Sequence, residues 1–337
     1  MAAGHHVERE LRARALQSAR GEILPDRAIG HLLEAVNRRL DFADDIEITL
    51  EANPGTAEAG HFAGYRAAGV NRLSMGVQSL DDAQLRRLGR IHNRDEALRA
   101  YELARKAGFA NINLDLMYAL PEQNVAAALA DLHALIALQP EHISWYQLTL
   151  EPNTEFGLRP PPVPDSDTAW TMQEQGQARL ADAGYAQYEV SAYARGRRQS
   201  RHNRNYWEFG DYLGIGAGAH GKRTLRADAA ARITRRARHK HPKIYLQHAG
   251  TTQAVQQEQE IAASELPFEF LMNALRLREG FAIADFAART GLRWDEHIAG
   301  LTAARQRGLL EEGGGRVRCS ELGWRHLNGL LSLFLEA

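Results

Sequence analysis

The sequence predicts an α/β protein, built as an incomplete βα barrel that is followed by a small helical domain. Short strands alternate with amphipathic helices between residues 44 and 150, and this alternation is typical of parallel βα units. One face of each strand is polar, whereas strands covered by helices on both sides are usually apolar on both faces. After residue 266, three helical patterns precede a glycine turn between short strands, which resembles a winged-helix module.

These patterns place the elements of the barrel. The predicted strands are Ile46–Leu50, Arg72–Val77, Ile112–Met117 and His142–Leu148, and the helices between them include Arg94–Ala107 and Val125–Leu138. The proline-rich residues 159–164 should form an extended connection, after which Asp165 or Ser166 caps a helix that runs to about Ala183. A further strand near Gln187–Val190 leads into a loop rich in aromatic and polar residues.

We predict four regions along the chain. Residues 1–22 form a divergent, polar and helix-prone N-terminal segment, and residues 23–225 form the barrel with its aromatic loop. Residues 226–262 form a basic connecting segment, which we expect to be a solvated helix face or a mobile arm. Residues 263–337 form the C-terminal domain, with Gly308–Ser320 as a wing and Glu321–Leu335 as a closing helix.

Composition excludes several classes of protein. The 337 residues carry 41 basic and 42 acidic side chains, so no global attraction to nucleic acid or membranes is expected. No apolar run is long enough to cross a bilayer and no signal peptide opens the chain, so we expect a cytoplasmic protein. The one cysteine, Cys319, excludes an intrachain disulfide and any cluster held by several thiolates of this chain.

Polar side chains recur on one face of all four predicted strands. Because side chains alternate along a strand, the polar rows are Glu47, Thr49 and Glu51; Arg72, Ser74 and Gln78; Asn111, Asn113 and Asp115; and Gln147 with Thr149. Helices would cover the apolar rows, so the polar rows should line a water-filled interior of the barrel. Glu51, Gln78 and Asp115 lie at the carboxyl ends of their strands, where chemistry gathers in βα barrels. We interpret them as ligand contacts, with satisfied structural polar groups as the alternative.

The densest chemistry lies between residues 188 and 221. His202–Trp207 carries an imidazole, two carboxamides, a guanidinium, a phenol and an indole, and the glycine-rich run 214–221 follows it. Each buried polar group would need its own hydrogen-bond partner, so this run suits a loop around a flat or anionic ligand better than a core. A structural corner with satisfied polar groups is the alternative.

Several familiar motif matches fail on their context. Gly216–Gly221 spells G-x-G-x-x-G, but a basic stretch follows it in place of the helix and acidic residue of a dinucleotide site. Arg223 stands where a P-loop needs Ser or Thr to bind magnesium. His239 and His241 have no accompanying carboxylate or thiol cluster, so we expect solvated histidines instead of zinc ligands.

Six ordered motifs give the chain a specific resemblance. They are EITLEANPGT (Glu47–Thr56), RLSMGVQS (Arg72–Ser79), LGRIH (Leu88–His92), NLDLMYALPEQ (Asn113–Gln123), SWYQLTLEPNT (Ser144–Thr154) and HNRNYW (His202–Trp207). Together they resemble the HemW family of bacterial heme chaperones, radical S-adenosylmethionine proteins long described as oxygen-independent coproporphyrinogen III oxidase-like. The resemblance runs from about residue 25 to the C-terminus. It implies a partial, roughly six-unit βα barrel with a small helical C-terminal domain.

The resemblance implies roles for individual residues. Glu51, Gln78, Arg90 and Asp115 match barrel positions that contact S-adenosylmethionine in the related oxidase. Carboxylates suit the amino and ribose hydroxyl groups of this ligand, and an arginine suits its carboxylate. The HNRNYW run is characteristic of the chaperone branch, which makes His202 the candidate heme-iron ligand, with Tyr206 or Trp207 packing on the porphyrin. The candidates for pairing with heme propionates are Arg195, Arg197, Arg198 and Arg201.

The chain departs from the family at its start. Family members open with a strand that carries CxxxCxxC and a second strand that ends in GGGTP, and neither motif is present. Without three cysteines the chain cannot hold the [4Fe–4S] cluster expected of the family, so we do not expect oxidase activity. We interpret the chain as either an N-terminally truncated or mis-started gene product or a degenerate relative.

The resemblance therefore implies a heme chaperone-like protein that passes heme to acceptor proteins, with a homodimer left open. One alternative is an oxygen-independent coproporphyrinogen III oxidase-type enzyme of porphyrin biosynthesis, which the missing cysteines and the HNRNYW run both disfavour. A second alternative is a nucleic-acid-binding protein that uses the basic segment and the winged-helix-like end. The balanced charge and the acidic Glu311 and Glu312 beside the wing disfavour that alternative.

Overall fold

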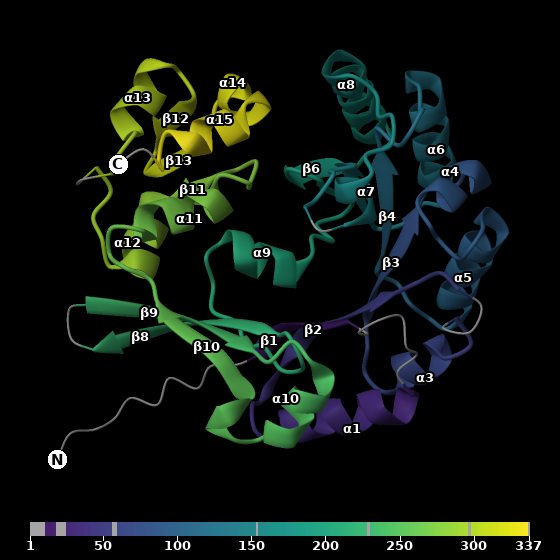
Figure 1. Ribbon diagram of the computed structural model, residues 1–337, viewed down its shortest axis with the longest axis horizontal. Coiled ribbons are helices and arrows are strands. Elements are labelled where there is room, and N and C mark those ends of the chain that lie inside the picture. The colour runs from purple at the N-terminus through teal and green to yellow at the C-terminus, as the bar shows by residue number, and fades with distance from the viewer. Residues whose placement is uncertain are drawn as a thin grey trace. The chain divides into compact units, whose positions relative to one another are not determined.

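The chain folds into two compact units, residues 1–202 and residues 203–337 (Figure 1). The computed structural model describes residues 11–17, 25–55, 59–152, 154–227, 230–295 and 298–335. Most of the predicted N-terminal segment, residues 1–10 and 18–22, lies outside this described part. The predicted division into four regions stays a prediction.

The first unit is built on one seven-stranded sheet with the order β1-β2-β3-β4-β5-β7-β6. Its strands are β1 (Leu11–Gln17), β2 (Phe42–Ala52), β3 (Arg72–Gln78), β4 (Ile112–Tyr118), β5 (His142–Gln147), β6 (Ala186–Glu189) and β7 (Ala192–Ala194). The neighbours from β1 to β5 pair in parallel, and β7 pairs antiparallel to both β5 and β6. This order confirms the predicted α/β fold with a partial barrel.

Helices cover one side of this sheet. They are α1 (Asp26–Asn37), α3 (Phe62–Ala67), α4 (Asp82–Arg87), α5 (Arg94–Lys106), α6 (Val125–Ala137), α7 (Glu155–Leu158) and α8 (Ser166–Asp182). Figure 1 shows α1, α3, α4, α5, α6 and α8 along the outer side of the curved sheet. Asp165 is the N-cap of α8, as predicted, because its carboxylate accepts the backbone N–H of Thr168 at 2.8 Å.

The apolar face of the sheet packs against these helices. Leu73, Leu114 and Ile143 come from three neighbouring strands and are fully buried in one core. On β5, Trp145 packs so close to α8 that a Cβ on Gly176 would lie 1.8 Å from the indole. Glycine at this position therefore allows the helix to approach the sheet.

Two predictions for this unit were wrong. The segment Leu11–Gln17, expected to be helix-prone, is strand β1 and pairs with β2 from Leu11↔Phe42 to Gln17↔Glu51. Pairing with the sheet overrides the local helix propensity, because it satisfies backbone groups along β2 that an edge would leave open. On β5 the polar row was assigned to Gln147 and Thr149, but both are exposed. Ser144 and Tyr146 make the inner contacts instead, since Ile143 and Trp145 fill the apolar face.

The second unit contains two small antiparallel sheets, β10-β9-β8 and β11-β13-β12. The first has β8 (His220–Ala227), β9 (Ala230–Arg238) and β10 (Val255–Glu260), and the second has β11 (Phe281–Ala282), β12 (Leu310–Gly313) and β13 (Arg316–Cys319). The helices are α10 (Pro242–His248), η2 (Thr252–Ala254), α11 (Leu266–Ala274), α12 (Ile283–Thr290), α13 (Leu301–Gln306), α14 (Glu321–Arg325) and α15 (Leu327–Ser332). The predicted wing corresponds to the hairpin of β12 and β13, which turns at residues 314 and 315.

Two expectations for the second unit also need correction. The basic segment is not a helix face or a mobile arm over residues 230–238, because these residues form β9, the central strand of its sheet. Its arginines pair with glutamates of β10, for example Arg236 with Glu258 at 2.9 Å, so cross-strand charge pairing favours the strand. The predicted closing helix is two short helices, α14 and α15, which are separated at His326.

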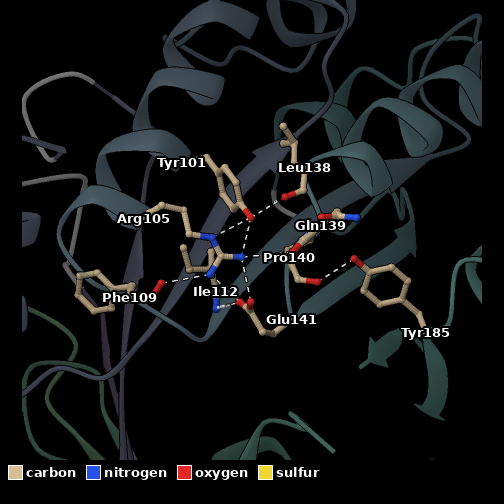
Figure 2. Close-up of polar contacts among 9 residues, drawn as sticks. All are labelled: Tyr101, Arg105, Phe109, Ile112, Leu138, Gln139, Pro140, Glu141 and Tyr185. Carbon is tan, nitrogen blue, oxygen red and sulfur yellow. Dashed lines mark hydrogen bonds and ion pairs between the residues drawn. The ribbon is translucent and has the colours of Figure 1, made fainter. Parts of the chain in front are cut away.

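A partly buried ion pair joins helix α5 to the amino-terminal ends of strands β4 and β5 (Figure 2). Arg105 binds both carboxylate oxygens of Glu141, at 2.9 and 3.0 Å, and Glu141 also accepts the backbone N–H of Ile112. Tyr101 accepts two hydrogen bonds from Arg105 and donates one to the carbonyl of Leu138. Paired, bidentate contacts of this kind fix geometry as well as contribute energy.

We expect Glu141→Gln to lower the free energy of unfolding of the first unit by about 2 kcal/mol, because hydrogen bonds to charged groups contribute about 1.5–3 kcal/mol. Glu122→Gln is the control, since the pair of Glu122 with Arg87 is largely exposed and should contribute less than about 1 kcal/mol. Urea denaturation followed by circular dichroism measures both variants. Equal losses of stability would contradict a special role for the partly buried pair of Arg105 and Glu141.

Candidate functional site

The amide of Asn113 lies at the centre of the polar face of the first unit. Its Nδ2 donates to Ser74 Oγ at 2.8 Å and to Asp115 Oδ1 at 2.7 Å. Its Oδ1 accepts from His142 Nδ1 at 2.6 Å and from Ser144 Oγ at 3.0 Å. All four hydrogen-bonding positions of the amide are used, so one side chain joins strands β3, β4 and β5 on their inner face.

A chain of hydrogen bonds continues from Asn113 toward residue 200. Burial, followed by the nearby charges of Arg72 and His202, lowers the pKa of His142 well below its usual value, so this imidazole is neutral. Its Nδ1–H therefore donates to Asn113, and its Nε2 accepts the Tyr188 hydroxyl at 2.9 Å. The Tyr188 oxygen in turn accepts the backbone N–H of Ser200 at 3.3 Å. Strand β5 is thereby linked through β6 to the segment that precedes His202.

Two carboxyl groups interact electrostatically, Glu51 near the carboxyl end of β2 and Asp115 in the middle of β4. Burial raises the pKa of Asp115, and hydrogen bonds from Asn113 and Ser144 only partly offset it. Burial also raises the pKa of Glu51, and the negative charge of Asp115 raises it further. Among the described residues no hydrogen-bond donor reaches the Glu51 carboxylate. Like charges held together in this way favour a cationic ligand between them.

Gln78 and Arg90 lie at the same end of the sheet. Gln78 ends β3 with φ 67°, and its Oε1 accepts the Tyr146 hydroxyl at 2.7 Å. Burial, and then the charge of Asp115, raises the pKa of Tyr146 to about 12, so this hydroxyl stays a donor at neutral pH. Arg90 donates to the carbonyl of Gly76 at 3.2 Å and to Asn53 at 2.9 Å. The four predicted S-adenosylmethionine contacts therefore come from the carboxyl ends of β2 and β3, the middle of β4 and the loop between α4 and α5.

The predicted aromatic loop is a helix, α9 (Arg201–Trp207). Its first residue, Arg201, donates its backbone N–H to Glu47 Oε1 at 2.9 Å, which satisfies an amide that the helix itself leaves open. His202 follows, with its side chain 12% exposed and its Nδ1 3.2 Å from Ser200 Oγ and 3.8 Å from Glu47 Oε1. The loop prediction was wrong because a distant carboxylate, invisible in the local sequence, caps this turn.

Glu47 is ionised in spite of its burial. Burial raises the pKa of this carboxyl group, but contacts with His202, Arg72 and the backbone N–H of Arg201 outweigh that effect and leave the pKa lowered. The Glu47 carboxylate is 7% exposed, so its charge acts in a poorly solvated part of the lumen.

The aromatic residues of α9 belong to the second unit. Tyr206 is 37% exposed and packs edge-on against Tyr212, with ring centroids 4.7 Å apart. Trp207 has one face covered by the guanidinium of Arg276, 4.3 Å from the ring centroid. Tyr206 is therefore the more accessible aromatic surface on this helix.

The other candidates from the sequence have varied surroundings. Arg195 lies over the Tyr185 ring and donates to the carbonyl of Ala183, and Arg201 pairs with Asp45 at 2.8 Å. Arg197 and Arg198 are exposed. His220 is exposed beside the glycine turn, whereas His92 is buried and hydrogen-bonded to the carbonyl of Val77.

The members of the network that sequence reasoning missed include Ser144 and three residues with aromatic rings, His142, Tyr146 and Tyr188. Their aromatic rings gave no clear polar signal, although His142 and Tyr146 share the alternating row that contains Ser144. Tyr188 could be found only through the contact of β6 with the inner face, which the local pattern does not encode.

The only thiol of the sequence belongs to the second unit and not to this network. Cys319 is buried in the second unit, where its Sγ lies 3.6 Å from the carbonyl of Leu275. Burial raises the pKa of this thiol to about 12. The described residues hold no group of three or more His, Cys, Asp or Glu side chains arranged for a metal ion, and no described helix could span a membrane.

Comparisons with known proteins agree with this architecture. The family model of the radical SAM superfamily matches residues 7–135, and that of the HemN C-terminal domain matches residues 261–326. A solved structure, coproporphyrinogen III oxidase (HemN) from Escherichia coli, aligns with TM-score 0.74 and 20% identity over 92% of this chain and 74% of that chain. The fold and the polar inner face thus define a radical SAM-type barrel followed by a HemN-type C-terminal domain.

Two curated relatives are far more similar in sequence. Heme chaperone HemW of Haemophilus influenzae is 48% identical over 91% of this chain and 79% of its own length. Heme chaperone HemW of Escherichia coli is 46% identical over 97% of this chain and 85% of its own length. The chain belongs to the HemW family.

The raised pKa values of Asp115 and Glu51 predict a pH dependence of stability. The folded state binds these protons more tightly than the unfolded state, so stability is lost as pH rises through the folded-state pKa values. Asp115→Asn should therefore raise the urea midpoint at pH 8 and leave it nearly unchanged at pH 3, where both forms are neutral. A lower midpoint for Asp115→Asn at pH 8 would mean that the carboxylate stabilises the fold.

Proposed function

We propose that this chain binds heme and passes it to heme-accepting proteins. The observation that carries the proposal is the 46–48% identity to two proteins named heme chaperone HemW, over more than nine-tenths of the chain. The structural likeness to the oxidase, at 20% identity, supports the fold and not its reaction.

The proposed heme site lies on helix α9, with His202 as the ligand to iron. Neutral imidazole is a common axial ligand of heme, and among the described residues Nε2 of His202 has no hydrogen-bond partner. Tyr206 follows one helical turn later and offers an exposed ring for packing on the porphyrin, while Trp207 would offer the face that Arg276 leaves uncovered. Arg197 and Arg198 are the more exposed candidates for the propionates, with Arg195 and Arg201 already engaged by protein groups.

His202→Ala should shift or abolish the Soret band of the heme complex and weaken heme affinity at least about 10-fold, or about 1.4 kcal/mol. Titration with hemin, followed by absorbance, measures both. His220→Ala and His92→Ala are the controls and should keep the wild-type spectrum. If His220→Ala loses the wild-type Soret band while His202→Ala keeps it, the iron ligand lies in the glycine turn. If none of the three variants changes the Soret band or the heme affinity, another region holds heme.

The barrel also fits S-adenosylmethionine. The carboxyl groups of Glu51 and Asp115 suit its ammonium and sulfonium charges, Arg90 suits its carboxylate, and Gln78 adds an amide at the same end of the sheet. When bound next to a reduced iron–sulfur cluster, this cofactor supplies radical chemistry. The 337 residues do not fit such a cluster, since their one thiol is buried and protonated, and we therefore propose binding without cleavage.

Glu51→Gln should weaken S-adenosylmethionine binding about 10- to 100-fold, because one charge-assisted hydrogen bond contributes about 1.5–3 kcal/mol. Isothermal titration calorimetry measures the affinity, and Glu122→Gln, on the exposed surface, should bind like the wild type. Unchanged affinity together with a large loss of thermal stability would show that Glu51 serves the fold instead of a ligand.

We do not propose the alternative functions. The oxidase reaction would need the cluster that these residues cannot hold. Nucleic-acid binding would need free cations along the basic segment, but Arg232, Arg235 and Arg236 all pair with glutamates. A homodimer stays a prediction.

A further inference from the structure

The carboxylate of Glu47 forms an ion-pair contact with the ring of His202, 3.8 Å from its Nδ1. It projects from β2 into the polar face, is 7% exposed, and accepts the backbone N–H of Arg201 at 2.9 Å. The hydrogen bond from Arg201 holds the carboxylate in place. The first turn of α9 therefore fixes the distance of 3.8 Å between Glu47 Oε1 and His202 Nδ1. Segment 200–202 has a second fixed point, the hydrogen bond from Ser200 N–H to Tyr188.

The two polar groups next to Nδ1 of His202 bear differently on the tautomer of this ring. Ser200 Oγ, 3.2 Å from Nδ1, can donate or accept a hydrogen bond and so permits either tautomer. An ionised carboxylate can only accept, and it would repel a lone pair on Nδ1. Glu47 thus favours the tautomer with hydrogen on Nδ1, which leaves the lone pair on Nε2.

We propose that Glu47 is a positioning residue that presents Nε2 of His202 to the iron of heme. The inference rests on the proposed function, because it takes His202 as the ligand. An acceptor behind a metal-bound imidazole fixes the ring, selects the tautomer and makes the ring a stronger electron donor. Glu47 therefore acts on the iron through His202 without touching it.

The tautomer can be tested without heme. Nitrogen-15 spectra of the heme-free protein, with His202→Ala to identify one of the 14 histidines, should show His202 protonated on Nδ1 and bare on Nε2. Glu47→Gln keeps an oxygen for the Arg201 N–H but removes the charge, and it should move His202 toward a mixture of tautomers. A wild-type ring protonated on Nε2 would overturn the inference, whatever heme does.

The effect on the iron is a second, independent test. With heme bound, Glu47→Gln should weaken affinity about 10- to 100-fold, raise the reduction potential and lower the ferrous iron–imidazole stretching frequency in resonance Raman spectra. Asp131→Asn is the matched control, because Asp131 is also a 7% exposed carboxylate but binds Ser79 and Leu80 away from His202. It should leave all three quantities at wild-type values.

The outcomes separate this inference from the proposed function. If His202→Ala removes the axial ligand while Glu47→Gln behaves like Asp131→Asn, the heme site stands and the role of Glu47 is wrong. If His202→Ala leaves the heme spectrum unchanged, the ligand assignment fails, and the role of Glu47 at the iron fails with it. A Glu47→Gln protein in which affinity, potential and stretching frequency all change as expected, while Asp131→Asn keeps wild-type values, supports positioning.

Discussion

The stability of the first unit depends on hydrogen bonds to the polar side chains that its sheet buries. A sheet with helices on one side only needs something to fill its inner face, and here that face carries amides, hydroxyls, imidazoles and carboxylates. Each such group costs free energy unless it is hydrogen-bonded, which makes the fully used amide of Asn113 the central constraint. Because it joins three strands, a change in any one of its partners disturbs the others.

The same constraint acts on Asp115 and Glu51, the carboxyl groups that we propose as ligand contacts. Asp115 receives its hydrogen bond from an amide that is itself fixed, so the carboxylate cannot turn away from Glu51 to relieve their repulsion. Charge held in an unfavourable arrangement is a common property of binding sites, where the ligand supplies the missing counter-charge. Stability and binding therefore oppose each other at this pair.

Alternation along the chain was enough to predict strands β2 to β5 to within a few residues, since each has a buried apolar row. The alternation did not predict segments whose secondary structure depends on contacts with residues distant in the sequence. Strand β1 is stabilised by pairing with β2, and strand β9 by ion pairs with glutamates of β10. Helix α9 begins where the carboxylate of Glu47 accepts the backbone N–H of Arg201. On β5 polar side chains fall in both alternating rows, Ser144 in one and Gln147 in the other, so hydropathy alone could not say which of the two faces inward. The carboxylates were found because charge on a strand is rare, whereas His142 and Tyr188 looked like ordinary strand residues.

The lone thiol of the chain has a practical consequence. Cys319 is buried with a raised pKa, so it stays protonated and unreactive at neutral pH. A cysteine introduced at an exposed site, such as Arg197 or Leu246, would be the one thiol that a maleimide dye or nitroxide reagent modifies. The natural chain is thus already suited to site-specific labelling, and pairs of such labels would report the distance between the two units in solution, with and without heme.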